Sequence, residues 1–190
     1  MIFAKRLEVC QLGNPVLRQV ADPVTDIKSA AVQTLINDLI TTLKHQKGVG
    51  IAAPQVGQLL QLIIIASYPN ERYPDAPLME PLPMINPQIV SYSTQTIKGW
   101  EGCLSVPGIR GQVSRAATIT VNYLDRHGQP QHQEFSGFVA RIIQHECDHL
   151  MGQVFLDHVT STKEMVTEAE YLKLATPQPT ATPALSSQKS

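Results

Sequence analysis

The spacing of apolar residues predicts a long amphipathic helix near the start of the chain. Between Asp26 and Gln46, apolar side chains recur every three or four positions, at Val32, Leu35, Ile36, Leu39, Ile40 and Leu43. This spacing gathers them on one face of a helix, and packing in the protein core is the expected use of such a face. Just before it, Leu12-Gly13-Asn14-Pro15 is typical of a turn.

Short apolar runs separated by turn residues predict strands after this helix. Leu60 to Ala66 favours a buried strand, and the Pro-rich residues Tyr68 to Pro83 favour a loop. Ala117 to Asp125 and Gln131 to Ser136 flank Arg126-His127-Gly128-Gln129-Pro130, and this arrangement predicts a hairpin.

A second helix is expected where the chain becomes apolar again. Gly137 to Ile143 is a nearly continuous apolar run, which favours a helix buried on most sides, and Gly152 is a plausible stop. Asp148, within this helix, is expected to accept a hydrogen bond from a metal-binding histidine or to pair with a nearby arginine such as Arg141, rather than to bind the metal itself. A final helix is predicted from about Thr160 to Ala175.

The second helix carries the most informative motif, Gln144-His145-Glu146-Cys147-Asp148-His149. Residues four apart share one face of a helix, so His145 and His149 can offer two imidazole nitrogens to one metal ion. Glu146 lies one position round the helix, where its carboxylate can take a proton from a metal-held water as that water attacks a carbonyl. The alternative is a helix with two ordinary histidines.

A catalytic metal site needs a third protein ligand and an open coordination position. Upstream, Trp100 to Pro107 places Cys103 in a turn-like segment bounded by Gly and Pro, and a thiolate suits iron, cobalt, nickel or zinc. Spacing favours Cys103 but leaves several downstream residues open. These are Asp157, His158, Glu164, Glu168 and Glu170.

A third segment, Gly48 to Gly57, is rich in small residues that suit close approach of another backbone. It lacks the third glycine and the following helix of a dinucleotide site. Gln55 offers a neutral amide donor for an oxygen that becomes negative in a transition state. The alternative is that Gln55 only satisfies local backbone groups.

Taken together, the three segments G-x-G-I-A-A-P-Q, E-G-C-L-S and Q-H-E-x-D-H-L resemble the signature of the peptide deformylases. They occur in the right order, and the resemblance covers about residues 5 to 172. It implies an enzyme that hydrolyses the formyl group from the N-terminal methionine of newly made polypeptides and releases formate. The expected mechanism is attack by a metal-bound water assisted by Glu146.

The resemblance also implies a metal site. Cys103, His145 and His149 match the metal ligands of the family, with water as the fourth ligand, and Glu146 matches the general acid/base. The expected cofactor is one divalent ion, Fe²⁺, for which Ni²⁺, Co²⁺ or Zn²⁺ can substitute.

The substrate contacts follow in the same way. Gln55 and the backbone N–H of Leu104 match the groups that stabilise the oxyanion, and Gly50 lies where the family contacts the formyl end of the substrate. The expected partners are N-formylmethionyl nascent polypeptides.

The methionine side chain of such a substrate needs an apolar pocket. The segment Gly48 to Ile51 could pair with an extended peptide by strand addition, which tolerates many sequences. Val49, Phe138 and Ile142 are the candidates for the pocket. The alternative for Phe138 and Ile142 is plain core packing.

The element order predicts an α+β fold with one catalytic domain over residues 1–175. Mostly antiparallel strands would pack around a central metal-binding helix, with a long N-terminal helix and a C-terminal helix. Residues 176–190 are rich in Pro, Thr, Ser and Ala, so we expect a disordered tail.

The composition of the chain narrows the choice of binding partners and of cellular compartment. The net charge of −1 argues against nucleic-acid binding through bulk charge, although a local patch for the ribosome stays open. Cys10 and Cys147 are expected to be reduced core residues, which fits a reducing compartment. No secretory h-region follows Met1, and the longest apolar run, Leu62 to Ala66, is too short to span a bilayer. We expect the bacterial cytoplasm or an organelle of bacterial descent.

Three other classes of protein remain as rivals. A general metallopeptidase would cut internal peptide bonds and take its third ligand downstream. A structural zinc protein would close the site with four protein ligands and have no use for Glu146. A binding module without catalysis would tolerate loss of Gln55 and Glu146.

Overall fold

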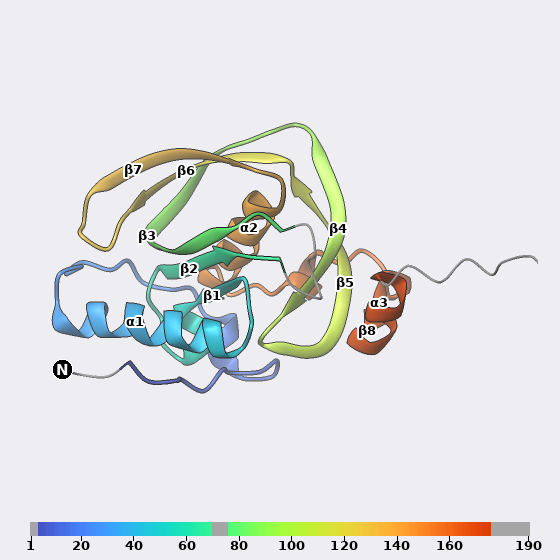
Figure 1. Cartoon of the computed structure of the whole chain (residues 1–190), viewed down its shortest axis with the longest axis horizontal. Helices are drawn as coiled ribbons and strands as arrows, with labels where there is room; N and C mark the ends of the chain where they lie inside the picture. The colour runs from blue at the N-terminus through green and yellow to red at the C-terminus, as the bar shows by residue number, and fades with distance from the viewer. Residues whose placement is uncertain (1–3, 70–75, 176–190) are drawn as a thin grey trace, which may run out of the picture.

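The computed structural model describes residues 4–69 and 76–175 as a mixed α/β fold with two antiparallel sheets (Figure 1). The five-stranded sheet has the order β1-β2-β3-β6-β7, and the three-stranded sheet has the order β4-β5-β8. The strands of the first sheet are β1 (Gly50–Ala52), β2 (Leu62–Ser67), β3 (Met79–Tyr92), β6 (Thr118–Leu124) and β7 (Pro130–Ser136). Those of the second are β4 (Thr96–Cys103), β5 (Val106–Ala116) and β8 (Met165–Thr167).

Three α-helices accompany the sheets in the described residues: α1 (Ala30–His45), α2 (Gly137–Leu150) and α3 (Glu168–Ala175). The described residues also contain four short 3-10 helices: η1 (Pro15–Arg18), η2 (Ala53–Val56), η3 (Phe155–His158) and η4 (Thr162–Glu164). None of the described helices is long and apolar enough to cross a membrane. The prediction of an α+β fold with antiparallel strands is confirmed in this outline.

The apolar pattern of β2 explains why helices cover the sheet on two sides. Successive strand residues point to opposite faces, so Leu62 and Ile64 belong to one apolar cluster and Ile63 and Ile65 to another. The first cluster contains the buried face of α1, and the second contains the apolar residues of α2. The sheet therefore holds α2, which carries the two histidines, against its interior strands.

The predicted N-terminal helix and the hairpin are both present. The helix begins at Ala30, because the Ser29 side chain accepts a hydrogen bond from the Val32 N–H and caps it. Strands β6 and β7 pair in register from Thr118↔Ser136 to Leu124↔Pro130. The run expected to begin at Leu60 forms β2 from Leu62 to Ser67.

The prediction of a Pro-rich loop from Tyr68 to Pro83 is wrong in its second half, since β3 begins at Met79. Residues 70–75 of the predicted loop lie outside the described residues. Pro83 sits opposite Ile64 of β2. Pairing with β6 starts only at Ile85. The first half of β3 is therefore locally an edge, where a residue without an N–H is tolerated.

The C-terminal helix expected from Thr160 to Ala175 is also shorter than predicted. Residues 162–164 form η4, and β8 pairs with Ile109, Arg110 and Gly111 of β5, so helix α3 begins only at Glu168. Backbone pairing with a distant strand overrides the local preference here. The expected tail lies outside the described residues, and the extent of the single domain remains a prediction.

Candidate metal centre and active site

Helix α2 and the end of β4 bring three candidate ligands together. His145 and His149 project from successive turns of α2, and Cys103 is the last residue of β4. Their ligand atoms all lie within 4.8 Å of one another. The Cys103 Sγ is 3.2 Å from the His149 Nε2. One thiolate and two imidazoles at this spacing fit a divalent metal with a position left over.

The charge state of Cys103 also suits a ligand. Burial alone would raise the pKa of its thiol, but the charge of His149 and hydrogen bonds with both histidines hold that pKa well below its usual range. The Ser105 N–H adds a donor to the Cys103 Sγ at 3.4 Å. Since the thiolate and not the thiol binds metals, the site favours the form that a metal needs.

Within the described residues, none of the downstream alternatives for the third ligand belongs to this cluster, and each lies against another charged side chain. Asp157 pairs with Arg18, Glu164 with Lys98, Glu168 with Arg110, and Glu170 with Lys173; His158 lies 3.0 Å from Asp148. The geometry therefore groups the histidines with Cys103.

Glu101 is a site residue that sequence reasoning missed. It is buried, and its Oε2 lies 2.9 Å from the His145 Nδ1. Arg115 donates to both of its carboxylate oxygens, at 2.9 and 3.0 Å, and Arg141 donates to Oε1 at 2.8 Å. Burial would raise the pKa of Glu101, but the bonds from His145 and Arg115 hold it well below its usual range. The carboxylate therefore fixes the ring of His145 with Nε2 toward the cluster.

The available signal for Glu101 was its place two residues before Cys103, because residues two apart in a strand share a face. Asp148 does pair with an arginine, as expected, but that arginine is not Arg141. Asp148 pairs with Arg115 at 2.7 Å, whereas Arg141 is held by Glu101. Arg115 lies between the two carboxylates and screens their repulsion.

Glu146 lies beside the ligand cluster and is almost fully buried. Burial raises the pKa of its carboxyl to about 7. Within the described part of the chain its Oε2 has no hydrogen-bond partner. A Cβ on Gly50 would come within 2.2 Å of the Glu146 Oε1, so only glycine leaves room for this side chain. The two expected site residues are thus in direct contact.

Gln55 approaches the cluster from η2. Its Oε1 accepts a hydrogen bond from the Ala52 N–H at 2.8 Å. Its Nε2 donates to the Cys103 Sγ at 3.4 Å and to the Ser105 Oγ at 3.0 Å. The amide therefore presents its donor side, and not its oxygen, to the metal ligands.

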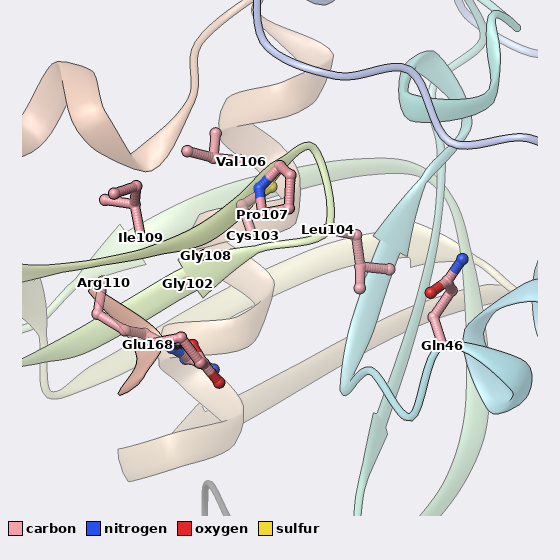
Figure 2. A pocket seen from close by; sticks show the side chains of 10 residues that line it. All are labelled: Gln46, Gly102, Cys103, Leu104, Val106, Pro107, Gly108, Ile109, Arg110 and Glu168. Atoms are coloured by element: carbon pink, nitrogen blue, oxygen red, sulfur yellow. Dashed lines mark hydrogen bonds and ion pairs between the residues drawn. The ribbon is translucent and has the colours of Figure 1, made fainter. Parts of the chain in front are cut away.

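A cavity of about 240 Å³ opens beside Cys103 (Figure 2). The end of β4, the start of β5 and Leu104 between them form much of its wall. Leu104 lies near Gln46, which follows helix α1, and Arg110 lies next to Glu168. Leu104 lines this cavity next to Cys103, and the role expected for its backbone N–H stays a prediction. The residues lining this cavity are Gln46, Gly102, Cys103, Leu104, Val106, Pro107, Gly108, Ile109, Arg110 and Glu168.

The three residues expected to hold methionine also come together. Val49, Phe138 and Ile142 line one pocket that also contains His145 and Glu146. Ile142 is only 4% exposed and belongs to the core cluster against which Val49 and Phe138 pack. Both the pocket and the core-packing interpretation agree with this position.

Comparison with known proteins supports one family. The family model for polypeptide deformylase matches residues 6–165. Peptide deformylase 2 of Nostoc sp. is 56% identical over 170 residues, which cover 90% of this chain and 95% of the relative. Peptide deformylase 2 of Shewanella oneidensis is 52% identical, covering 80% and 84%.

Solved structures agree. The Met-Ala-Ser-bound class I type b peptide deformylase of Acinetobacter baumannii superimposes with a TM-score of 0.81 at 43% identity, covering 83% of this chain and all of that one. The Thermotoga maritima peptide deformylase gives a TM-score of 0.73 at 33% identity, covering 82% and 99%. With its ligand cluster and signature segments in place, the chain belongs to the polypeptide deformylase family.

Proposed function

We propose that Cys103, His145, His149, Glu146, Gln55 and the Leu104 N–H carry out the reaction of the family in this chain. As a member of that family, the protein is a metal-dependent hydrolase that removes the N-formyl group from newly made polypeptides. The observation that supports these roles is the buried Oε2 of Glu146, which has no hydrogen-bond partner among the described residues, beside three ligand atoms within 4.8 Å of one another.

Cys103, His145 and His149 would hold one divalent ion, and we propose Fe²⁺ as the native metal, with Ni²⁺, Co²⁺ or Zn²⁺ as substitutes. The donor set of one sulfur and two nitrogens is soft enough for these ions. Such an ion would acidify water and polarise the formyl oxygen at its open position. Glu101 supports it by orienting His145.

Glu146 is the proton carrier in this proposal. Its carboxylate accepts the proton of the attacking water as the oxygen adds to the formyl carbon, and then delivers it to the amine nitrogen as the C–N bond breaks. The products are formate and a free N-terminal amine. Burial that raises the pKa of Glu146 to about 7 makes the carboxyl able both to accept and to return a proton near neutral pH.

Gln55 and the Leu104 N–H act as donors to the formyl oxygen, which gains negative charge during the attack. Gln55 is fixed by its bond from Ala52, and Leu104 directly follows a ligand. Donors that are already in place need no reorganisation in the transition state.

The peptide is proposed to dock along Gly48 to Ile51, with its methionine in the pocket of Val49, Phe138 and Ile142. Among the described strands, β1 pairs with β2 alone, and its three residues are buried and in contact with α2. Main-chain pairing there would accept many nascent sequences. Contact with the ribosome and a place in the bacterial cytoplasm, or in an organelle of bacterial descent, remain parts of this proposal.

The central test is formate release from a formyl-Met peptide beside casein cleavage, with metal analysis under anaerobic conditions. We expect formate release with intact casein, because the site is built to act on the formyl amide. Casein cleavage without formate release would instead indicate a general metallopeptidase. An acetyl-Met peptide is the matched control substrate.

Changing Cys103 to Ser is expected to weaken metal binding strongly, because a neutral hydroxyl replaces an anionic ligand. The measurement is metal content after dialysis, together with turnover of the formyl-Met peptide. Cys10→Ser is the matched control, since Cys10 lies outside the ligand cluster. Full metal occupancy and normal turnover in Cys103→Ser would exclude Cys103 as a ligand.

Changing Ile142 to Asp is expected to raise KM for formyl-Met peptides roughly tenfold or more, because a charged group would replace an apolar wall of the methionine pocket. Ile142→Ala serves if the aspartate variant does not fold. Peptides with formyl-Met and formyl-Ala should be compared, since loss of a pocket removes the preference for methionine. An unchanged KM, or an equal change in KM for both peptides, would mean that Ile142 only packs in the core and does not form part of the methionine pocket.

A further inference from the structure

Ser105 is a buried polar residue that the proposed chemistry does not use. It lies in the turn between β4 and β5, two residues after Cys103, and has 0% exposed surface. Its Oγ accepts a hydrogen bond from the Gln55 Nε2 at 3.0 Å, across 50 positions in the sequence. A buried hydroxyl that accepts a hydrogen bond from an amide elsewhere in the sequence restricts the orientation of that amide.

The partners of Gln55 define its orientation. The Ala52 N–H can only donate, so the atom that it contacts at 2.8 Å must be the amide oxygen. The amide nitrogen then has two protons. One is directed at the Ser105 Oγ and the other at the Cys103 Sγ, which lies 3.4 Å away among the metal ligands.

The outer end of a glutamine side chain has little rotational preference of its own. With Ala52 alone, only the oxygen is held, and the nitrogen could turn out of line with the ligand cluster. The Ser105 hydroxyl oxygen accepts a hydrogen bond from one N–H of the amide and so directs the other N–H toward the cluster. Without that hydroxyl, a buried donor would also be left unsatisfied, which favours rotation of the amide.

The backbone fixes the distance between the two side chains. The Cys10 N–H donates to the Gln55 carbonyl and the Leu12 N–H donates to the Ser105 carbonyl, both at 2.7 Å. The segment from Cys10 to Leu12 thereby connects η2 to the turn between β4 and β5, so the hydroxyl and the amide meet at a set separation.

We propose that Ser105 is a positioning residue, which holds the Gln55 amide so that one N–H stays directed at the Cys103 thiolate and the reacting oxygen. It touches neither the substrate nor a reacting atom. This inference rests on the role proposed for Gln55. It adds that this role requires Ser105 to keep the Gln55 amide in the correct orientation.

The test is a double-mutant cycle in the metal-loaded enzyme with Ser105→Ala, Gln55→Ala and both together. Ser105→Ala should lower kcat about tenfold with little change in KM, because the donor remains but is no longer aligned. In the Gln55→Ala background, Ser105→Ala should lower kcat no further, because residues that act through one another are not additive.

The thiolate-to-metal charge-transfer band of the Co²⁺-loaded protein gives a readout independent of turnover. Loss of the N–H donor to the Cys103 Sγ should shift this band to lower energy, in the same direction in Ser105→Ala and Gln55→Ala. Ser105→Ala keeps the backbone N–H donor of residue 105, so a shift reports on the amide of Gln55.

Ser67→Ala is the matched control. Ser67 is also a serine with 0% exposed surface, and within the described residues its Oγ has no hydrogen-bond partner. Its replacement should leave kcat and the Co²⁺ band unchanged. Ser105→Thr, which keeps the hydroxyl, should restore most of the kcat lost in Ser105→Ala.

The outcomes separate this inference from the role of Gln55. A low kcat in Gln55→Ala with normal kcat and band in Ser105→Ala overturns the inference alone. A normal kcat in folded Gln55→Ala overturns both. Equal losses from Ser105→Ala in both backgrounds, or failure of both Ser105→Ala and Ser105→Gly to fold, would make Ser105 a structural residue and overturn the inference.

Discussion

Glu146→Gln is expected to lower kcat roughly a hundredfold or more while metal content stays unchanged, because an amide cannot accept the proton of the attacking water. The two side chains have nearly the same shape, so glutamine fits the space that Gly50 leaves. The three candidate ligands are untouched by the change. The measurements are kcat for a formyl-Met peptide and metal per protein chain.

Glu134→Gln is the matched control, since Glu134 is exposed on β7, which packs at the far edge of the five-stranded sheet. It should have normal turnover and normal metal content. If Glu146→Gln loses metal together with activity, Glu146 is a ligand or a structural residue and the proton-transfer role is wrong.

Gln55→Ala is expected to cost about 3 kcal/mol of transition-state stabilisation, a fall in kcat of roughly 10²–10³, with little change in metal content or folding. The amide nitrogen is 3.4 Å from the Cys103 Sγ, so it lies beside the proposed metal site, where the formyl oxygen would gain charge. The ground state has no such charge, so kcat should change more than KM.

Gln61→Ala is a suitable control, because Gln61 donates to the Ala21 carbonyl in a loop outside the ligand cluster. Circular dichroism and metal analysis establish that each variant is folded and loaded. Near-normal kcat in a folded, metal-loaded Gln55→Ala protein would mean that Gln55 only satisfies the Ala52 N–H and its other neighbours.

Helix α1, the β6–β7 hairpin and the pair of histidines could be predicted because each depends on residues close together in the chain. The apolar stripe of α1 repeats with the period of a helix, and the hairpin strands are joined by a short turn. The spacing of His145 and His149 alone places both rings on one face of α2. The match to three signature segments then indicated the peptide deformylase family.

Local patterns misled where a distant partner decided the structure. Met165 to Thr167 adds to β5 as a strand, because its backbone groups find partners at Ile109 to Gly111. The prolines before Ile85 predict a loop by composition, yet this segment forms the first half of β3 and pairs with β2. Its other side has no partner among the described strands until β6 joins at Ile85, so prolines, which lack an N–H, are tolerated there. In both segments, backbone hydrogen bonds between strands outweighed a local preference.

By itself, the sequence determined the reaction family, the candidate ligand residues and the helix that carries two of them, since these follow from residue identity and short spacing. Only the tertiary structure decided that Glu101 orients His145, that Arg115 joins Glu101 to Asp148, and that Ser105 meets Gln55. Apart from the bond between Arg115 and Glu101 on neighbouring strands, these contacts join segments more distant in the chain, and a hydrogen bond across such a separation leaves no periodicity in the sequence. Folding alone brings the partners within reach, and burial then makes every unpaired polar group costly enough to fix them in place.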